Sequence, residues 1–294
     1  MKKTKIAARS TGKGSSPEIT APSLVIQAAG RNMAPEDLEL LRQAARSLEH
    51  PSFAIRLSSV LGTPIEKAEK FLPQPAYKLI YSTAHTAIEK AFEAAVSSLR
   101  NGRKRRPPRN VFYRTLAAGT GAVGGLFGLY GLLLDLPIST TIMLRSIAEI
   151  ARANGEDLYT LESRMACLEV FALGGHAETD NAAESGYYGL RFALALPVTQ
   201  ATRYVSRYGM AAQGAPMLTS LVQAVSARFG AVVSQRAAAQ MVPLIGAAGG
   251  SALNLLFISH FQEMARGHFV VRRLERKYGP ELVSQVYKEF RSEA

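Results

Sequence analysis

The sequence predicts an all-α fold, and two features of its 294 residues lead to that class. Apolar residues recur every three to four positions over several long segments, which is typical of amphipathic helices. No segment shows the convincing alternation of apolar and polar residues that marks a half-exposed strand. Hydrophobic residues make up 47% of the chain and charged residues 20%, so the chain can bury a large core and does not have the composition of a disordered protein.

The first half of the chain predicts a basic tail followed by helices. Residues 1–33 are rich in Ser, Gly, Lys and Pro, so we expect a flexible tail that precedes a single helical domain over residues 34–290. A helix should begin at Pro35, because two acidic residues follow in its first turn. The apolar spacing over residues 76–100 predicts a longer amphipathic helix.

The second half predicts further helices with breaks between them. Pro137 is expected to start a helix that ends at Asn154 and Gly155, and residues 159–173 are expected to be helical again. Breaks are expected at Pro197, Gly209, Gly214 and Pro216. The last predicted helix is amphipathic and basic and continues through Tyr278.

Two runs without a charged residue, Thr115–Leu134 and Ala237–Ser259, are rich in small residues. Each contains glycines four positions apart, in GAVGG and in GAAGG, and on a helix this spacing lets another backbone approach closely. Each run is long enough to cross the hydrocarbon of a bilayer. Three interpretations remain open: a hairpin buried in a soluble core, a membrane-spanning helix, and an element that lies at the membrane interface.

The chain carries a net charge of +12, and its basic residues are concentrated near the N-terminus, in residues 100–114 and in residues 266–277. Such clusters attract anionic lipid, and each basic side chain near the surface contributes about 1 kcal/mol. The candidate lipid-binding residues are Arg103, Lys104, Arg105, Arg106, Arg109, Arg272 and Arg273. Because the basic N-terminus has no apolar run behind it, we expect a cytoplasmic protein at the inner face of the cell membrane.

Several functional classes lack their signatures. The single cysteine, Cys167, excludes an intramolecular disulfide and a multi-cysteine metal site, and we expect it to be a small buried residue. The motif GxGxxG at residues 119–124 lacks the strand and the acidic residue that a nucleotide site requires. The RKRR cluster at 103–106 lacks interleaved aromatic residues, so sequence-specific nucleic-acid binding is not expected. No cofactor and no metal site are predicted.

Polar residues near the uncharged runs form an alternative hypothesis. His260 and Glu263 share a helical face at a spacing that metals can use, and His268 lies close to that face. The alternative function is therefore a metal-assisted hydrolase built on Asp135, His260, Glu263 and His268, whose shell His176 or Asp180 could complete. Arg145 is the remaining candidate, and we expect it to pair with Glu149 or Asp135 because an unpaired buried charge is costly.

Residues 129–158, 164–175 and 242–279 together resemble the EcsC protein family, and the likeness extends over about residues 35–290. The resemblance implies a mainly helical bacterial protein that is cytoplasmic or membrane-associated. In some bacteria the family member is encoded beside an ABC transporter that affects secretion, which makes such a transporter a candidate partner. The resemblance supplies no catalytic residues, and it leaves the oligomeric state undetermined.

Overall fold

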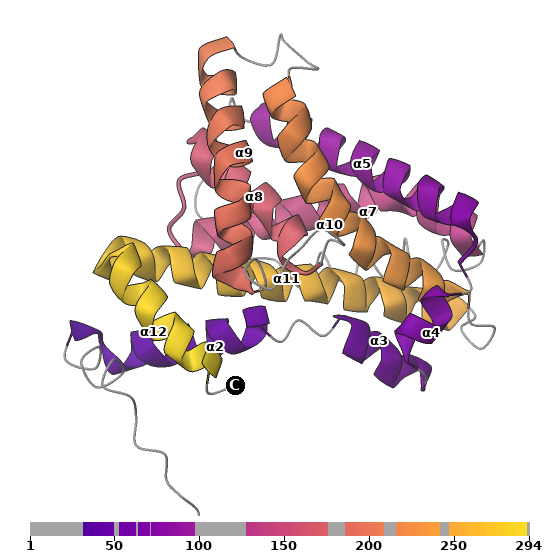
Figure 1. The fold of residues 1–294 in the computed structure, drawn as a ribbon, viewed down its shortest axis with the longest axis horizontal. Helices are drawn as coiled ribbons and strands as arrows, with labels where there is room; N and C mark the ends of the chain where they lie inside the picture. The colour runs from indigo at the N-terminus through magenta and orange to yellow at the C-terminus, as the bar shows by residue number, and fades with distance from the viewer. Residues whose placement is uncertain are drawn as a thin grey trace, which may run out of the picture.

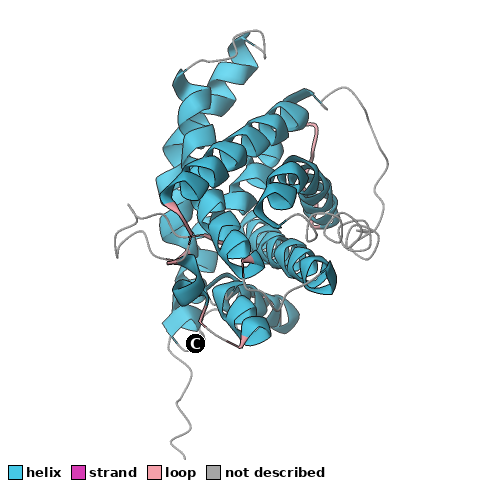
Figure 2. Cartoon of the chain, turned by 90° about the vertical axis from the view of Figure 1, so that its right-hand side faces the viewer, coloured by secondary structure: helices cyan, strands magenta, loops and turns pink. Residues whose placement is uncertain are grey.

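The computed structural model describes residues 32–49, 53–62, 64–70, 72–97, 128–175, 186–208, 216–241 and 247–292. All regular structure in these segments is helical, which confirms the all-α class (Figures 1 and 2). The described helices are α2 (Pro35–Glu49), α3 (Phe53–Leu61), α4 (Ile65–Glu69), α5 (Gln74–Ser97), α7 (Gly128–Ala153), α8 (Leu161–Leu173), α9 (Tyr187–Tyr208), α10 (Pro216–Gln240), α11 (Ala247–Tyr278) and α12 (Pro280–Ser292).

The long helix α11 organises the packing of the described elements. It crosses the molecule, with α2, α3 and α12 packed along one side and α7, α8 and α10 against the other (Figure 1). Helix α10 in turn packs against α5 and α9. Phenylalanines fill the junction of α8, α10 and α11: the ring centroids of Phe171 and Phe229 are 5.2 Å apart, and those of Phe229 and Phe261 are 5.6 Å apart. Aromatic packing of this kind joins helices that are far apart in the sequence.

Several predicted helix boundaries are confirmed. Helix α2 begins at Pro35, α10 begins at Pro216 and α11 ends at Tyr278. Helix α7 ends at Ala153, and Gly155 then adopts a φ of 84°, a conformation that glycine reaches at little cost. The predicted segment 159–173 corresponds to α8, whose first turn is capped when the Oγ1 of its N-cap threonine accepts a hydrogen bond from a backbone amide.

The predicted effects of two prolines are wrong. Pro137 does not start a helix, and Pro197 does not break one, because they lie inside α7 and α9. A proline inside a helix removes one backbone hydrogen bond. Next to the proline, the side chain of Thr140 donates to the carbonyl of Leu136 at 2.7 Å and that of Thr141 to the carbonyl of Pro137 at 2.9 Å, in addition to the backbone bonds of the helix. The packing of α7 against its neighbours therefore outweighs the local preference of proline.

The structure tests the hypothesis of a single spanning helix for one of the two uncharged runs. Of Thr115–Leu134, the structure describes only the part from Gly128, which begins α7. Ala237–Ser259 is divided between α10, which ends at Gln240, and α11, which begins at Ala247, so the hypothesis of a single helix here is wrong. Two helical stretches are long and apolar enough to cross a membrane, Tyr130–Ala153 and Pro216–Gln240. An apolar 18-residue segment of each is 61% buried, as in core helices of soluble proteins.

Other predictions fall on residues that the structure does not describe. These are the tail over residues 1–31, the basic segment 100–114, the GxGxxG motif at 119–124, and the candidate ligands His176 and Asp180. Cys167 lies within the described part, and it is a buried free cysteine, as expected. Burial raises the pKa of its thiol to about 12, so it has no thiolate character at neutral pH.

Candidate functional site

A buried ion pair joins α7 to α10. The Nη2 of Arg236 donates to the Oδ2 of Asp135 at 2.9 Å, and these side chains are 1% and 4% exposed. The guanidinium carbon of Arg236 lies 4.7 Å from the ring centroid of Phe257, on α11, a cation–π contact. Arg145, whose expected partner was Glu149 or Asp135, is exposed to solvent, and the ion pair that the structure shows for Asp135 is with Arg236. Asp135 takes its partner from a helix 101 positions further along the chain.

The hydrogen bonding of this pair is incomplete. The Nε and Nη1 of Arg236 and the Oδ1 of Asp135 are buried without a hydrogen-bond partner among the described residues. The Oε1 of Gln240, one helical turn beyond Arg236 on α10, is in the same condition. Burial lowers the pKa of Arg236, and the charge and hydrogen bond of Asp135 act in the opposite direction. Each unmade hydrogen bond of a buried polar group costs about 1–3 kcal/mol, and more for charged groups, so this arrangement is costly as it stands.

The surface of α7 next to this pair is apolar. Tyr130, Leu134 and Ile138 are 75%, 77% and 55% exposed, and their spacing of four places them along one face of the helix. We call these three residues the α7 apolar face. Arg145 continues the same face towards the C-terminal end of the helix and is also exposed. Asp135 directly follows Leu134 in the chain, but its side chain points away from this face and is buried.

His260 is a buried, uncharged histidine of α11. Its ring is packed between the rings of Phe53 and Phe261, with centroids 5.2 and 5.1 Å away. Gly174, at the end of α8, leaves the space for it: a Cβ on Gly174 would lie 1.9 Å from the Nε2 of His260. Burial lowers the pKa of His260 to about 4, so the ring is neutral at physiological pH. A side chain enclosed in this way has the surroundings of a core residue.

The other two residues of the hydrolase hypothesis have partners of their own. The Nδ1 of His268 lies 3.0 Å from the Oη of Tyr187, and burial lowers the pKa of His268 well below its ordinary value. Glu263 accepts a hydrogen bond from Arg56 at 2.6 Å. Among the described residues, no group of three or more His, Cys, Asp or Glu side chains could hold a metal ion. The four candidate side chains therefore take part in separate contacts.

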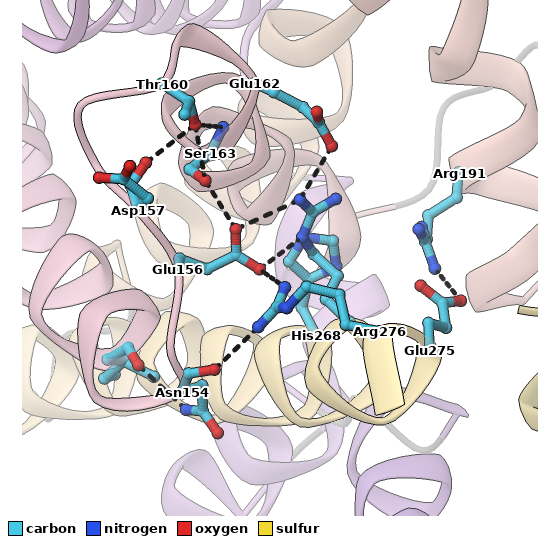
Figure 3. A network of polar contacts seen from close by, with 12 residues as sticks. Asn154, Glu156, Asp157, Thr160, Glu162, Ser163, Arg191, His268, Glu275 and Arg276 are labelled. Carbon is cyan, nitrogen blue, oxygen red and sulfur yellow. Dashed lines mark hydrogen bonds and ion pairs between the residues drawn. The ribbon is translucent and has the colours of Figure 1, made fainter. Parts of the chain in front are cut away.

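The basic end of α11 surrounds a buried carboxylate (Figure 3). Arg272 donates to both oxygens of Glu156, at 2.9 and 3.3 Å, and also contacts Glu162 at 3.3 Å. Ser163 donates to Glu156 at 2.7 Å, and Arg276 makes a further bond to it. Burial opposes ionisation of Glu156, but the hydrogen bonds from Arg272 and Ser163 outweigh it and the pKa is lowered. We call this group the Glu156 cluster.

The structure describes two of the seven candidate lipid-binding residues, Arg272 and Arg273. Arg272 is 14% exposed and its charge is shared with Glu156, while Arg273 is half-buried. The remaining candidates lie outside the described residues: Arg103, Lys104, Arg105, Arg106 and Arg109.

The sequence analysis did not identify the residues that pair with the candidate site residues. Arg236 and Glu156 were not singled out, and neither was Glu275, which accepts hydrogen bonds from Arg191 at 2.7 Å and Tyr188 at 2.9 Å. One signal for Arg236 was available: it is one of two charged residues in the 25 residues of α10. A charge on an otherwise apolar helix needs a partner when it is buried.

Comparison with known proteins identifies the family. The family model described as the EcsC protein family matches residues 36–274, from the start of α2 to the last turns of α11. No curated protein and no solved structure matches the chain. The matched range contains the buried ion pair, the α7 apolar face and the Glu156 cluster apart from Arg276. This match confirms the resemblance that the sequence showed. Because the match covers most of the chain, the protein belongs to the EcsC protein family.

Proposed function

We propose that this protein binds the cytoplasmic surface of anionic membranes, and that the α7 apolar face enters the interfacial layer of the bilayer. The observation that carries the proposal is the exposure of Tyr130, Leu134 and Ile138 along one face of α7. Contiguous apolar surface on a soluble protein is typical of contact sites for proteins or membranes. A tyrosine at the end of such a face suits the boundary between headgroups and acyl chains.

The energetics support attachment at the surface. Full burial of a large apolar side chain stabilises by about 1.5–3 kcal/mol, so transfer of three side chains that are more than half exposed is worth several kcal/mol. An apolar 18-residue segment of Tyr130–Ala153 is 61% buried against other parts of the protein, and a spanning orientation would expose that packed surface to lipid. Partial insertion of the exposed face keeps the core of the protein intact.

The charges near the α7 apolar face favour an anionic membrane over a protein partner. Arg145 extends the face with a positive charge, and long basic side chains at such positions reach the headgroups. The basic residues of 100–114 precede α7 in the chain, and no acidic residue interrupts them. Each basic residue near an anionic surface contributes about 1 kcal/mol, and this attraction falls with salt.

Vesicle flotation tests the proposal. The protein should float with vesicles of phosphatidylglycerol and phosphatidylcholine at low salt, float less at high salt, and stay unbound with phosphatidylcholine alone. Ile138→Asn combined with Leu134→Asn should weaken binding at least tenfold, since loss of more than about 1.4 kcal/mol changes an equilibrium tenfold. The matched control is Ile55→Asn, because Ile55 is 70% exposed but lies on α3.

Two results would contradict this function. One is the absence of binding to the anionic vesicles at low salt. The other is an equal loss of binding in the Ile55→Asn control, because apolar exposure in general, and not the α7 apolar face, would then be responsible. The link to an ABC transporter stays a prediction from the family resemblance, and co-purification of such a transporter from membranes is its test.

A further inference from the structure

The geometry points to a ligand site at the Asp135–Arg236 pair, and we infer that the site takes a phosphate group joined to a primary ammonium group. This is the chemistry of an ethanolamine phospholipid headgroup and of free phosphoethanolamine. The inference rests on the proposed function only for the choice of phosphate over carboxylate. It comes from the unmet hydrogen bonds of three side chains on α7 and α10.

The donors of the site belong to one guanidinium. Arg236 uses Nη2 for Asp135, which leaves Nε and Nη1 without a partner among the described residues. These nitrogens sit in a side chain that is 1% exposed, where an unmet charged donor is most costly. A guanidinium with free N–H groups is suited to bind a phosphate through two parallel bonds. An oxyanion is therefore the complement of this half of the site.

The acceptors of the site exclude a simple anion. The Oδ1 of Asp135 and the Oε1 of Gln240 are both buried without a donor in the described part of the chain. A free phosphate would meet Arg236 favourably, but its negative charge would face the carboxylate of Asp135, and its O–H groups carry no positive charge to offset that repulsion. A ligand that also carries N–H groups satisfies both sets, and an ammonium group is the most favourable such donor beside a carboxylate.

The position of the pair favours a ligand that arrives from the membrane. Leu134, directly before Asp135, belongs to the α7 apolar face and is 77% exposed. The ring of Phe257 covers one side of the guanidinium of Arg236 and makes that side apolar. A headgroup bound at the pair would leave its acyl chains beside the apolar surface of α7, whereas free phosphoethanolamine tests the polar half of the site alone.

Thermal unfolding in the presence of soluble probes tests this inference without a membrane. A ligand that binds the folded state raises the melting temperature in proportion to its concentration relative to Kd. Phosphoethanolamine should raise the melting temperature of the full chain. Phosphocholine should raise it less, because its quaternary nitrogen has no N–H to donate, and inorganic phosphate or ethanolamine alone should have the smallest effect.

Amino-acid substitutions test whether phosphoethanolamine binds at the Asp135–Arg236 pair. Gln240→Leu should weaken phosphoethanolamine binding about tenfold through the loss of one buried hydrogen bond to a charged group. Gln223→Leu is the matched control, because Gln223 is exposed on the same helix. Asp135→Leu combined with Arg236→Met removes the site with two apolar side chains of similar size and should abolish the effect of the probe.

The source of the ligand is separated with vesicles. If the headgroup is the natural ligand, adding phosphatidylethanolamine to phosphatidylglycerol vesicles should strengthen flotation of the wild type but not of the Asp135→Leu/Arg236→Met variant. A response to phosphoethanolamine without this difference supports the site with a soluble ligand.

The inference is overturned if phosphoethanolamine does not raise the melting temperature, or if phosphocholine matches it, or if the double variant responds as the wild type does. In each of these cases the protein can still float with vesicles of phosphatidylglycerol and phosphatidylcholine, so the vesicle experiment tests the proposed function independently of this inference.

Discussion

Helix α11 contacts two buried charge clusters, one through Phe257 and one through the arginines near its C-terminal end, and the clusters differ in how completely their hydrogen bonds are made. In the Glu156 cluster, two arginines and a serine donate to one carboxylate, whose pKa is lowered as a result. In the Asp135–Arg236 pair, a single hydrogen bond joins the charges and three of their buried atoms lack a partner among the described residues. Complete networks rigidify a fold, whereas incomplete ones mark strain or a missing ligand. The difference supports a structural role for the first cluster, and it is the basis of the binding role that we infer for the second.

The largest effect is expected in the Glu156 cluster. Glu156→Ala should lower the free energy of unfolding by about 3–5 kcal/mol, because it leaves Arg272 and Arg276 beside each other without their carboxylate. Chemical denaturation followed by circular dichroism measures it. Phosphoethanolamine should still raise the melting temperature of this variant. Loss of that response would mean that the two clusters are not independent.

The histidines of α11 test whether the core between the two clusters is dry. His260 has a pKa of about 4 in the folded protein and an ordinary value of 6.5, so the unfolded chain binds a proton first as the pH falls. The stabilisation is complete above pH 6.5 and is lost towards pH 4, by about 2–3 kcal/mol at pH 4.5. His268 acts in the same direction. Denaturation at a series of pH values measures the loss.

The replacement His260→Phe keeps an aromatic ring against Phe53 and Phe261 and removes the titrating group. It should therefore reduce the loss of stability between pH 6.5 and 4.5. Unchanged pH dependence in this variant would show that His260 is accessible to protons in the folded state.

A smaller effect on stability is expected at the incomplete pair. Asp135→Leu/Arg236→Met should change the free energy of unfolding by no more than about 1 kcal/mol, or raise it, because apolar replacements of similar size remove charges whose desolvation is poorly compensated. The corresponding pair Glu156→Leu/Arg272→Met should be clearly destabilising, since Ser163 and Arg276 lose their acceptor. Equal losses in both double variants, measured by denaturation, would remove the distinction between the clusters.

The smallest effect is expected at the exposed margin of α11. Lys277 contacts Asp37 at 2.6 Å, but the lysine side chain is 57% exposed. Exposed ion pairs contribute little because water and salt screen them. Lys277→Met should leave the midpoint of denaturation unchanged within error. A large shift would show that burial is the wrong criterion for ranking the ion pairs of this protein.

Local patterns predicted most of the helical segments but not the contacts between them. The start of α2, the end of α7 at Gly155 and the whole of α8 follow from composition, spacing and turn residues nearby in the sequence. Pro137 misled the same reasoning, because tertiary packing keeps α7 continuous across it. Of the two residues of the buried ion pair, the sequence analysis singled out Asp135 and missed Arg236.

The sequence by itself determined that this protein is helical, basic, without an intramolecular disulfide and similar to the EcsC protein family, since each of these properties depends on composition or on residues close together in the chain. Only the tertiary structure decided that Asp135 pairs with Arg236, that Arg272 serves Glu156, and that His260 fills the space above Gly174. The physical reason is that helical periodicity is encoded within a few turns. Burial and ion pairing depend instead on which helix faces meet, and more than 80 positions separate the residues that meet here.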